Sequence, residues 1–359
     1  MNFSGSSKAV KLNKTVTRSR GVALITVMLI VALCAVIASQ MTARLQIQMQ
    51  RSANVTFNQQ AYWYAMGAEA FTKRVLITAL SADKDVVNLS QIWAQGENTY
   101  PVDFGEISGE ITDLHSCLNL NALRAPLVDD SGNNSGGSNR NSSRNSNSNQ
   151  NDKVPARKAL EGLLINLQLD NVSQFEAESM ADALTDWLDA DGSISSAGGA
   201  EDSDYASREF AYMAANHFLA SVDELRVIEH FTPAVIEAIK PYVCVIPQSH
   251  VHQININTID EEHAPLLQAL LDSTLAQAQD ILGARGEKGF GTLDAFYNLK
   301  SVVEIEHFND KKEQFVIDSE YFTLKTSASF NRSFYNMRSV MKVTDNKYID
   351  VISRTVGRN

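Results

Sequence analysis

RSRGVALITVMLIVALCAVIAS, residues 18–39, is the stretch that decides how the rest of the chain is built. Two arginines and a glycine lead directly into an apolar run, and residues 22–39 contain no charged side chain. That length is about the minimum for a helix that spans a hydrocarbon core. The stretch fits a discarded signal peptide, a retained membrane anchor or a segment that is processed in a third way.

The charges around this run predict its orientation. The chain of 359 residues has a formal net charge of −11, yet residues 1–21 carry five lysines and arginines and no acid. By the positive-inside rule, the N-terminus is cytoplasmic and the residues beyond about 40 lie across the membrane. The acidic balance of that exported part argues against a phosphate-binding surface, which would concentrate lysine and arginine.

The residues after the apolar run continue the same helix. No proline interrupts residues 22–80, and Gly67 is the single glycine there. A continuous helix over this span would be about 88 Å long at 1.5 Å per residue. Apolar residues recur along its distal part at intervals of four and three: Phe57, Ala61, Tyr64, Ala68, Phe71 and Val75. We expect this stripe to pack on the chain's own soluble head.

Composition and hydrophobic spacing divide the residues after this helix into distinct segments. Residues 106–121, EISGEITDLHSCLNLN, alternate as a strand or hairpin does. Residues 129–152 contain no hydrophobic side chain and are predicted to form a disordered linker. Helical spacing dominates residues 155–245 and 255–310, whereas residues 313–359 hold three segments typical of an antiparallel meander. Because the early strand needs the late ones to form a sheet, we interpret the helices as an insertion within an α+β head.

Two cysteines lie in the exported part of the chain. Cys117 and Cys244 would meet an oxidising compartment that lets them pair, whereas Cys34 lies inside the apolar run. A disulfide and two buried free thiols are the two alternatives.

An acidic cluster lies within the helical block. Its members are Asp186, Asp189, Asp191, Glu201, Asp202 and Asp204, and glycines interleave with them. Calcium prefers six to eight oxygens at about 2.3–2.6 Å, and a glycine-rich loop lets carboxylates and carbonyls converge on such an ion. The spacing is not that of an EF-hand, since no glutamate closes the loop. From spacing alone, a metal site and a solvated acidic loop both stay open.

Several short motifs carry a resemblance to a known family. They are QQAYWYAMGAEAF at 59–71, CLNLNAL at 117–123, LTDWLDADG and GAEDSDY within 184–205, and ININT at 254–258. Together with the Arg-Gly junction before the apolar helix, they resemble the K-type minor pseudopilins of type II secretion. The resemblance runs from about residue 18 to residue 355, with the Asn/Ser-rich linker as its main departure.

The resemblance implies an α+β, type IV pilin-like fold with a long N-terminal spine helix, an antiparallel sheet and a large α-helical insertion. The implied boundaries are a basic leader at 1–21, a transmembrane spine helix at 22–58, the first part of the head at 59–121, a helical insertion at 122–312 whose second unit (255–310) is SAM-like or helix-hairpin-helix-like, and strands at 313–359 that complete the head.

The resemblance also implies a processing step and a set of partners. In that family a prepilin peptidase cuts on the cytoplasmic side after the glycine, which places cleavage here between Gly21 and Val22. The helix then remains as the single inner-membrane span and as a filament spine. The implied partners are the I-type and J-type minor pseudopilins, the major pseudopilin, the prepilin peptidase and the inner-membrane assembly platform, with the secretin and secreted cargo as further contacts and no nucleic acid.

Residue 26 departs from the pattern of most pilin-like subunits. They carry a glutamate five residues into the mature helix, where it is thought to neutralise the terminal ammonium of the subunit above; here that residue is Thr26. A carboxylate in hydrocarbon is costly unless it is paired, so a subunit with no neighbour above it should lack one. Thr26 is therefore interpreted as a marker of the filament tip, although an ordinary anchor helix avoids glutamate too.

For the acidic cluster, the resemblance implies calcium. The expected ligands are Asp189, Asp191, Glu201 and Asp202 with the carbonyl of Ile194, whereas Asp186 is expected to orient or cap the helix end.

The sequence thus predicts a non-enzymatic pseudopilus subunit that initiates assembly at the tip and supports the export of folded proteins. The alternative is a signal-anchored periplasmic protein that binds DNA or another ligand through its helix-hairpin-helix-like segment. The first hairpin of that segment, LLQALLDSTLAQAQ, lacks the glycines that would turn backbone N–H groups toward phosphate, which disfavours DNA.

Overall fold

The computed structural model describes residues 20–82, 86–124, 154–345 and 348–357. The predicted linker at 129–152 and nearly all of the predicted leader lie outside these ranges. The chain divides into two compact units, residues 1–59 and residues 60–359.

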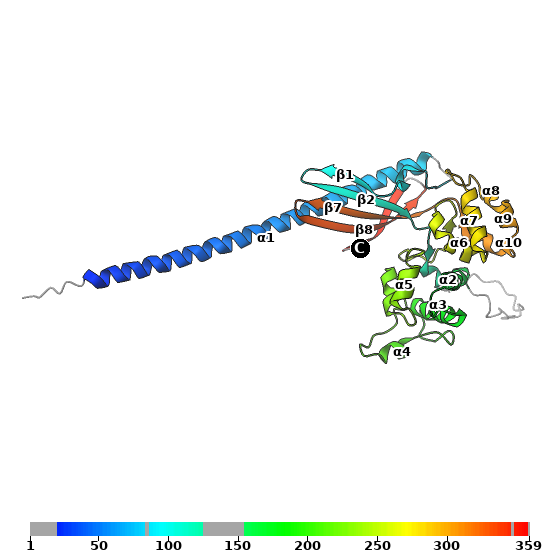
Figure 1. The fold of residues 1–359 in the computed structure, drawn as a ribbon, viewed down its shortest axis with the longest axis horizontal. Helices are drawn as coiled ribbons and strands as arrows, with labels where there is room; N and C mark the ends of the chain where they lie inside the picture. The colour runs from blue at the N-terminus through cyan, green and yellow to red at the C-terminus, as the bar shows by residue number, and fades with distance from the viewer. Residues whose placement is uncertain (1–19, 83–85, 125–153, 346–347, 358–359) are drawn as a thin grey trace, which may run out of the picture. The chain divides into compact units, whose positions relative to one another are not determined.

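The described part of the first unit is entirely helical. Helix α1 runs without a break from Arg20 to Ala82, as the sequence predicted (Figure 1). Its large apolar side chains between residues 22 and 55 are exposed, and among the described residues α1 is the one helix long and apolar enough to cross a membrane. The Thr26 hydroxyl donates to the carbonyl of Ala23 at 2.9 Å, so the helix itself satisfies this polar group.

In the second unit, the distal part of α1 packs on a five-stranded antiparallel sheet of order β1-β2-β7-β8-β9 (Figure 1). The strands are β1 (Asn98–Val102), β2 (Gly105–Asp113), β7 (Tyr321–Phe330), β8 (Ser333–Thr344) and β9 (Tyr348–Val356). Strand β2 pairs with β7 across more than 200 residues of sequence, with Ile111 opposite Leu324. Leu76 and Leu80 of α1 bury against Phe322 and Met341 of the sheet. The early strand and the late meander therefore form one sheet, and the fold is α+β.

The predicted stripe on α1 overlaps the buried face only in part. The residues buried at helical spacing are Ala61, Ala65, Glu69, Thr72, Leu76 and Leu80. Of the predicted stripe, Phe71 is 57 % exposed. It stacks edge to face on Tyr100 at a ring separation of 6.0 Å and, with Val75, lines a groove of about 470 Å³ between α1 and the sheet. The prediction is therefore confirmed for Ala61 and in part for Tyr64 and Val75, which pack against the core of the head. It is wrong for Phe71, because the buried face of the helix passes through Glu69 and Thr72 instead.

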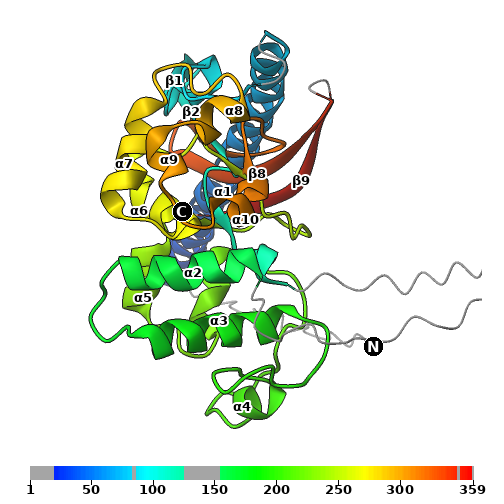
Figure 2. The ribbon, with the colours of Figure 1, turned by 90° about the vertical axis from the view of Figure 1, so that its right-hand side faces the viewer.

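The helices between β2 and β7 form two groups (Figure 2). The first group is α2 (Pro155–Asn166), α3 (Gln174–Leu188), α4 (Asp202–Ala206) and α5 (Pro233–Ile239); the second is α6 (Ala264–Leu271), α7 (Leu275–Ala284), α8 (Leu293–Tyr297), α9 (Lys300–Val303) and α10 (Phe308–Lys311). One continuous apolar core joins both groups, and helices α2 and α6 pack on each other. Two short parallel pairs, β3 (Leu118–Asn119) with β4 (Val243–Cys244) and β5 (Ile254–Asn255) with β6 (Phe315–Val316), connect the segments that enter and leave the block.

The helical spacing within residues 155–245 also predicts a helix at 221–231, SVDELRVIEHF, which is shorter in the structure. The segment at 221–231 forms only a 3₁₀ helix, Val222–Val227, because Ile228 takes an extended backbone that buries its side chain in the core.

Candidate functional site

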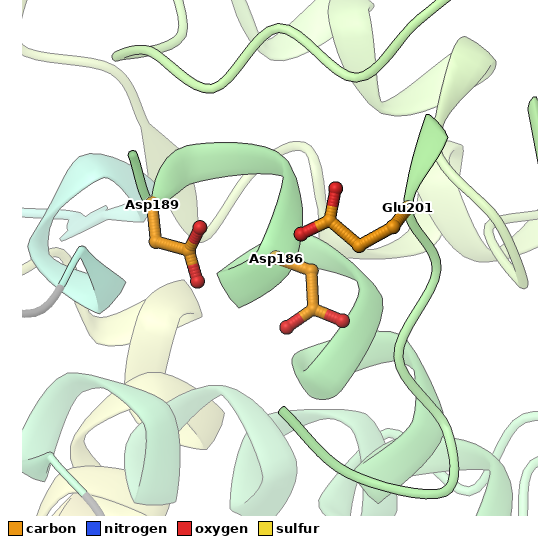
Figure 3. A group of neighbouring side chains, drawn as sticks. All are labelled: Asp186, Asp189 and Glu201. Carbon is orange, nitrogen blue, oxygen red and sulfur yellow. The ribbon is translucent and has the colours of Figure 1, made fainter. Parts of the chain in front are cut away.

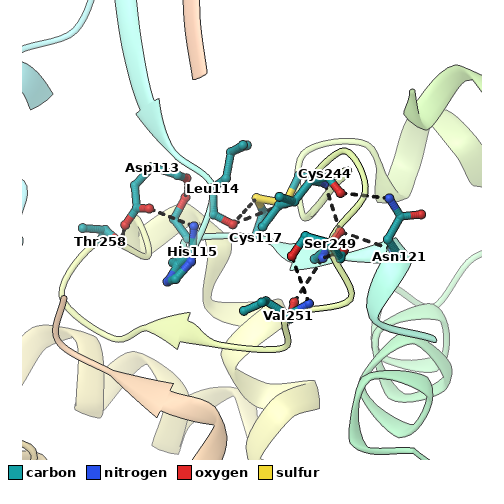
Figure 4. Close-up of a disulfide and its surroundings, with 12 residues drawn as sticks. Asp113, Leu114, His115, Cys117, Asn121, Cys244, Ser249, Val251 and Thr258 are labelled. Carbon is teal, nitrogen blue, oxygen red and sulfur yellow. Dashed lines mark hydrogen bonds between the residues drawn. A yellow bond between two sulfur atoms is a disulfide. The ribbon is translucent and has the colours of Figure 1, made fainter. Parts of the chain in front are cut away.

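A disulfide connects the two ends of the segment that contains the first group of helices. Cys117 follows β2 and Cys244 lies in β4; the two are bonded, with their Cα atoms 5.8 Å apart (Figure 4). Next to it, the Asn121 side chain donates to the carbonyls of Leu219 and Ile246, both at 3.0 Å. The two cysteines are separated by 127 positions, and the first group of helices lies between them. The disulfide and the Asn121 hydrogen bonds therefore hold the two ends of this group together.

Asp113, at the end of β2, connects the sheet to the helical block. Its carboxylate accepts hydrogen bonds from the hydroxyls of Thr258 and Ser319, both at 2.6 Å, and from the backbone N–H of His115 at 2.8 Å (Figure 4). Burial raises the pKa of Asp113, and the charge of His115 and the two hydroxyl donors offset this only in part. Sequence reasoning missed this residue, because its partners lie about 145 and 206 positions away.

Glu69 fixes α1 to the sheet. Its two carboxylate oxygens accept from Nε and Nη2 of Arg354, at 2.7 and 2.8 Å, and from the Ser339 hydroxyl at 2.7 Å. Burial by itself raises the pKa of Glu69, but the hydrogen bonds from Arg354 and Ser339 outweigh it, and the pKa is lowered overall. The bidentate pair specifies how the helix sits on β8 and β9.

A second group of carboxylates lies between α3 and α4. Asp186 is in the last turn of α3, Asp189 caps that helix, and Glu201 immediately precedes α4 (Figure 3). Each can offer one oxygen such that all three oxygens lie within 4.8 Å of one another. The turn of α3 and the path of residues 189–201 therefore bring together acids that are up to 15 positions apart.

Glu201 is the least satisfied member of this group. It is only 2 % exposed, and neither of its carboxylate oxygens has a hydrogen-bond partner among the described residues. Burial, followed by the charges of Asp186, Asp189 and Asp202, raises the pKa of Glu201 to about 7. Burial also raises the pKa of Asp186 and of Asp189. A buried, ionised carboxylate in this position requires a positive charge close to it.

The surrounding loop is shaped around Asp186. Ser195 donates to Asp186 from its hydroxyl and, at 3.2 Å, from its backbone N–H. A Cβ on Gly199 would lie 2.0 Å from Oδ2 of Asp186, so only glycine permits this approach. Convergent carboxylates and buried carboxylate oxygens without hydrogen-bond partners among the described residues fit a hard cation such as calcium.

The structure brings together some of the expected ligands and separates others. Asp189 and Glu201 lie in the group, and so does Asp186, which the sequence had assigned to orienting or capping the helix. Asp191 is exposed and accepts from the backbone N–H of Ser193 at 2.8 Å, and Asp202 accepts from that of Ala214 at 2.9 Å. The side chain of Ile194 is exposed next to Gly199.

A long apolar helix that packs its distal part on an antiparallel sheet defines a pilin-like subunit, here with a helical insertion. Two family models described as "Type II secretion system (T2SS), protein K" match residues 116–248 and 254–318. The chain belongs to this family, the K-type minor pseudopilins of the type II secretion system, whose members are structural pseudopilins and not enzymes.

Individual relatives agree with this assignment along nearly the whole chain. The type II secretion system protein K of Dickeya chrysanthemi is 36 % identical over 95 % of this chain and 97 % of that protein. The protein of the same name from Aeromonas hydrophila is 35 % identical over 92 % of this chain and 96 % of its own. A chain in the crystal structure of the GspK-GspI-GspJ complex from enterotoxigenic Escherichia coli superposes with a TM-score of 0.70 at 29 % identity, covering 84 % of this chain and 97 % of that one. The alternative of a signal-anchored DNA- or ligand-binding protein gives way to this family assignment.

Proposed function

We propose that this subunit caps the tip of the type II secretion pseudopilus. The observation that carries the proposal is Thr26, which stands in the exposed apolar part of α1 where a repeating filament subunit would carry a glutamate. A tip subunit has no neighbour above it whose terminal ammonium needs a carboxylate, and an unpaired carboxylate in hydrocarbon is unfavourable. Its head would then cover the end of the filament during the export of folded proteins.

The same proposal includes a processing step and a topology. The prepilin peptidase removes residues 1–21, and Val22 becomes the new N-terminus on the cytoplasmic side of the inner membrane. The basic residues before the apolar run support this orientation, because positive charge is retained in the cytoplasm. Residues 60–359 then lie in the periplasm, where the disulfide between Cys117 and Cys244 is stable.

The partners proposed for this chain are the I-type and J-type minor pseudopilins. Support comes from the relative in enterotoxigenic Escherichia coli, which was solved in a complex with GspI and GspJ. Exposed apolar side chains along the first part of α1 suit a bundle of spine helices, since association in hydrocarbon depends on close side-chain packing. Such a bundle would initiate the pseudopilus and meet the major pseudopilin and the assembly platform.

Calcium is proposed as the ion held by Asp186, Asp189 and Glu201. Oxygen donors in an irregular loop suit calcium, whereas magnesium demands near-octahedral geometry and gives up its waters reluctantly. When bound, the ion supplies positive charge for three carboxylates that otherwise repel one another.

Intact mass spectrometry of the protein from cells that contain the secretion system tests the processing on which the tip assignment depends. A polypeptide that begins at Val22 supports the proposal. A polypeptide that keeps Met1, or one cut near Ala38, contradicts it, because neither leaves a spine helix with residue 26 five residues from its start.

A further inference from the structure

A short loop after α4 displays two large apolar side chains. In residues 207–214, Phe210 is 81 % exposed and Met213 is 68 % exposed. The loop is nevertheless held at several points. The Tyr212 hydroxyl donates to the carbonyl of Val227 at 2.6 Å, and Arg208 pairs with Glu229 and also donates to Tyr212.

Two routes connect this loop to the carboxylate group. Asp202, the residue after Glu201, accepts from the backbone N–H of Ala214 at 2.9 Å. Tyr212 stacks on Tyr205 of α4, with ring centroids 5.2 Å apart. Trp187, the residue after Asp186, packs edge-on against Tyr205 at 5.2 Å and against Tyr212 at 6.4 Å. The contacts are continuous from the group to the loop, which is the physical requirement for coupling between them.

Glu201 links the carboxylate group to the start of α4. Residues 189–201 form neither helix nor strand, so the carboxylates of α3 and Glu201 are not held together by regular backbone hydrogen bonds. Three carboxylates within 4.8 Å repel one another unless a positive charge lies between them. Removal of that charge acts first on Glu201, which has no hydrogen-bond partner of its own among the described residues. Because Glu201 is the N-cap of α4, its displacement moves the helix that carries Tyr205.

We propose that a cation bound by Asp186, Asp189 and Glu201 fixes α4 and the loop at 207–214, so that Phe210 and Met213 form one ordered surface only when the ion is present. This inference rests on the cation site proposed above. It makes the ion a regulator of the surface that the helical domain displays, in addition to a stabiliser of the domain.

Limited trypsin proteolysis of the detergent-solubilised full-length protein tests the coupling. Cleavage after Arg208 is compared in calcium and in chelator, with calcium binding measured separately by calorimetry. We expect calcium to slow cleavage after Arg208 about tenfold or more, because a tenfold change corresponds to only 1.4 kcal/mol of opening free energy. Cleavage after Lys300, whose side chain is 90 % exposed on α9, serves as the internal control and should not change.

Substitutions outside the ligand group separate coupling from binding. Tyr212→Ala removes the stack on Tyr205 and should retain calcium binding while losing the protection of Arg208. Ala214→Pro, which removes the backbone N–H that Asp202 accepts, should act in the same way and replaces Tyr212→Ala if that variant does not fold. Tyr348→Ala, on β9 in the sheet, is the matched control and should keep the protection.

The outcomes distinguish the inference from the site on which it rests. If calorimetry records calcium binding but cleavage after Arg208 is equally fast with calcium and with chelator, the coupling is wrong and the site stands. If calcium does not bind, both are wrong. Full protection in both Tyr212→Ala and Ala214→Pro would also overturn the coupling.

Discussion

Two buried glutamates show how differently the two parts of the head are stabilised. Glu69, between α1 and the sheet, is 3 % exposed, and Glu201, between α3 and α4, is 2 % exposed. Glu69 accepts three hydrogen bonds from Arg354 and Ser339, whereas Glu201 has no hydrogen-bond partner among the described residues. The pKa of Glu69 is accordingly lowered, because its donors outweigh the burial that would raise it, and the pKa of Glu201 is raised by burial and by its acidic neighbours.

The contrast follows from the cost of burying charge. A buried carboxylate is tolerated when the protein supplies its counter-charge, and otherwise it takes up a proton or a cation. The pilin-like part of the head supplies this charge from its own C-terminal strand. In the function proposed above, an ion supplies this charge in the helical part, so we expect the stability of that part to depend on the cations in solution.

The largest effect is expected from removing the counter-charge of Glu69. Arg354→Ala leaves a buried carboxylate with Ser339 and, at 3.9 Å, Lys73. We expect a loss of about 3 kcal/mol in the free energy of unfolding, at the low end for a broken buried pair because Arg354 is itself partly exposed. Urea unfolding measures it. Lys300→Ala, which breaks an exposed pair with Glu304, is the control and should cost less than about 1 kcal/mol.

Removal of calcium should have the next largest effect. At a calcium concentration one hundred times its dissociation constant, binding to the folded state contributes about 2.7 kcal/mol, which chelation removes. The measurement is the melting temperature with calcium, with magnesium and with chelator. An unchanged melting temperature in chelator would contradict the site, and an equal rise with magnesium would contradict its preference for calcium.

Substitution by glutamine should change the free energy of unfolding in opposite directions at the two glutamates. Glu69→Gln weakens three charge-assisted hydrogen bonds and should destabilise the protein by about 2 kcal/mol. In chelator and at a pH above the pKa of Glu201, where its carboxylate is ionised, Glu201→Gln removes one of three repelling charges and should stabilise the protein by about 1 kcal/mol, while abolishing the response to calcium. Urea unfolding of both variants in chelator measures the two signs. The comparison fails if both variants are destabilised alike.

The smallest expected effect is the acid dependence of Glu69. Because its folded pKa lies below the ordinary value of 4.5, its contribution is present above that value and is lost as the pH falls through the folded pKa. The stability difference between the wild type and Glu69→Gln should therefore be constant near neutral pH and shrink only in acid. Unfolding curves at several pH values measure this difference. A difference that already shrinks near neutral pH would contradict the lowered pKa.

Local patterns in the sequence predicted the long helix and the C-terminal strands. Long-range contacts determine which face of α1 is buried and which carboxylates lie together. The continuous helix and the meander follow from periodicity and from the absence of proline, which act over a few residues. The buried face of α1 could not be predicted, because Glu69 is neutralised by a residue 285 positions away. The place of Asp186 in the carboxylate group could not be predicted, because its approach to Glu201 depends on the path of residues 189–201 past Gly199. Spacing alone does not define that path.

The most direct test of the tip assignment is native mass spectrometry of this protein, purified from membranes in detergent after expression with the prepilin peptidase and with the I-type and J-type minor pseudopilins that we propose as its partners. We predict a complex that contains one copy of each minor pseudopilin, in which this chain begins at Val22. A chain that retains its leader, or one that is recovered alone or only with copies of itself, would contradict the account.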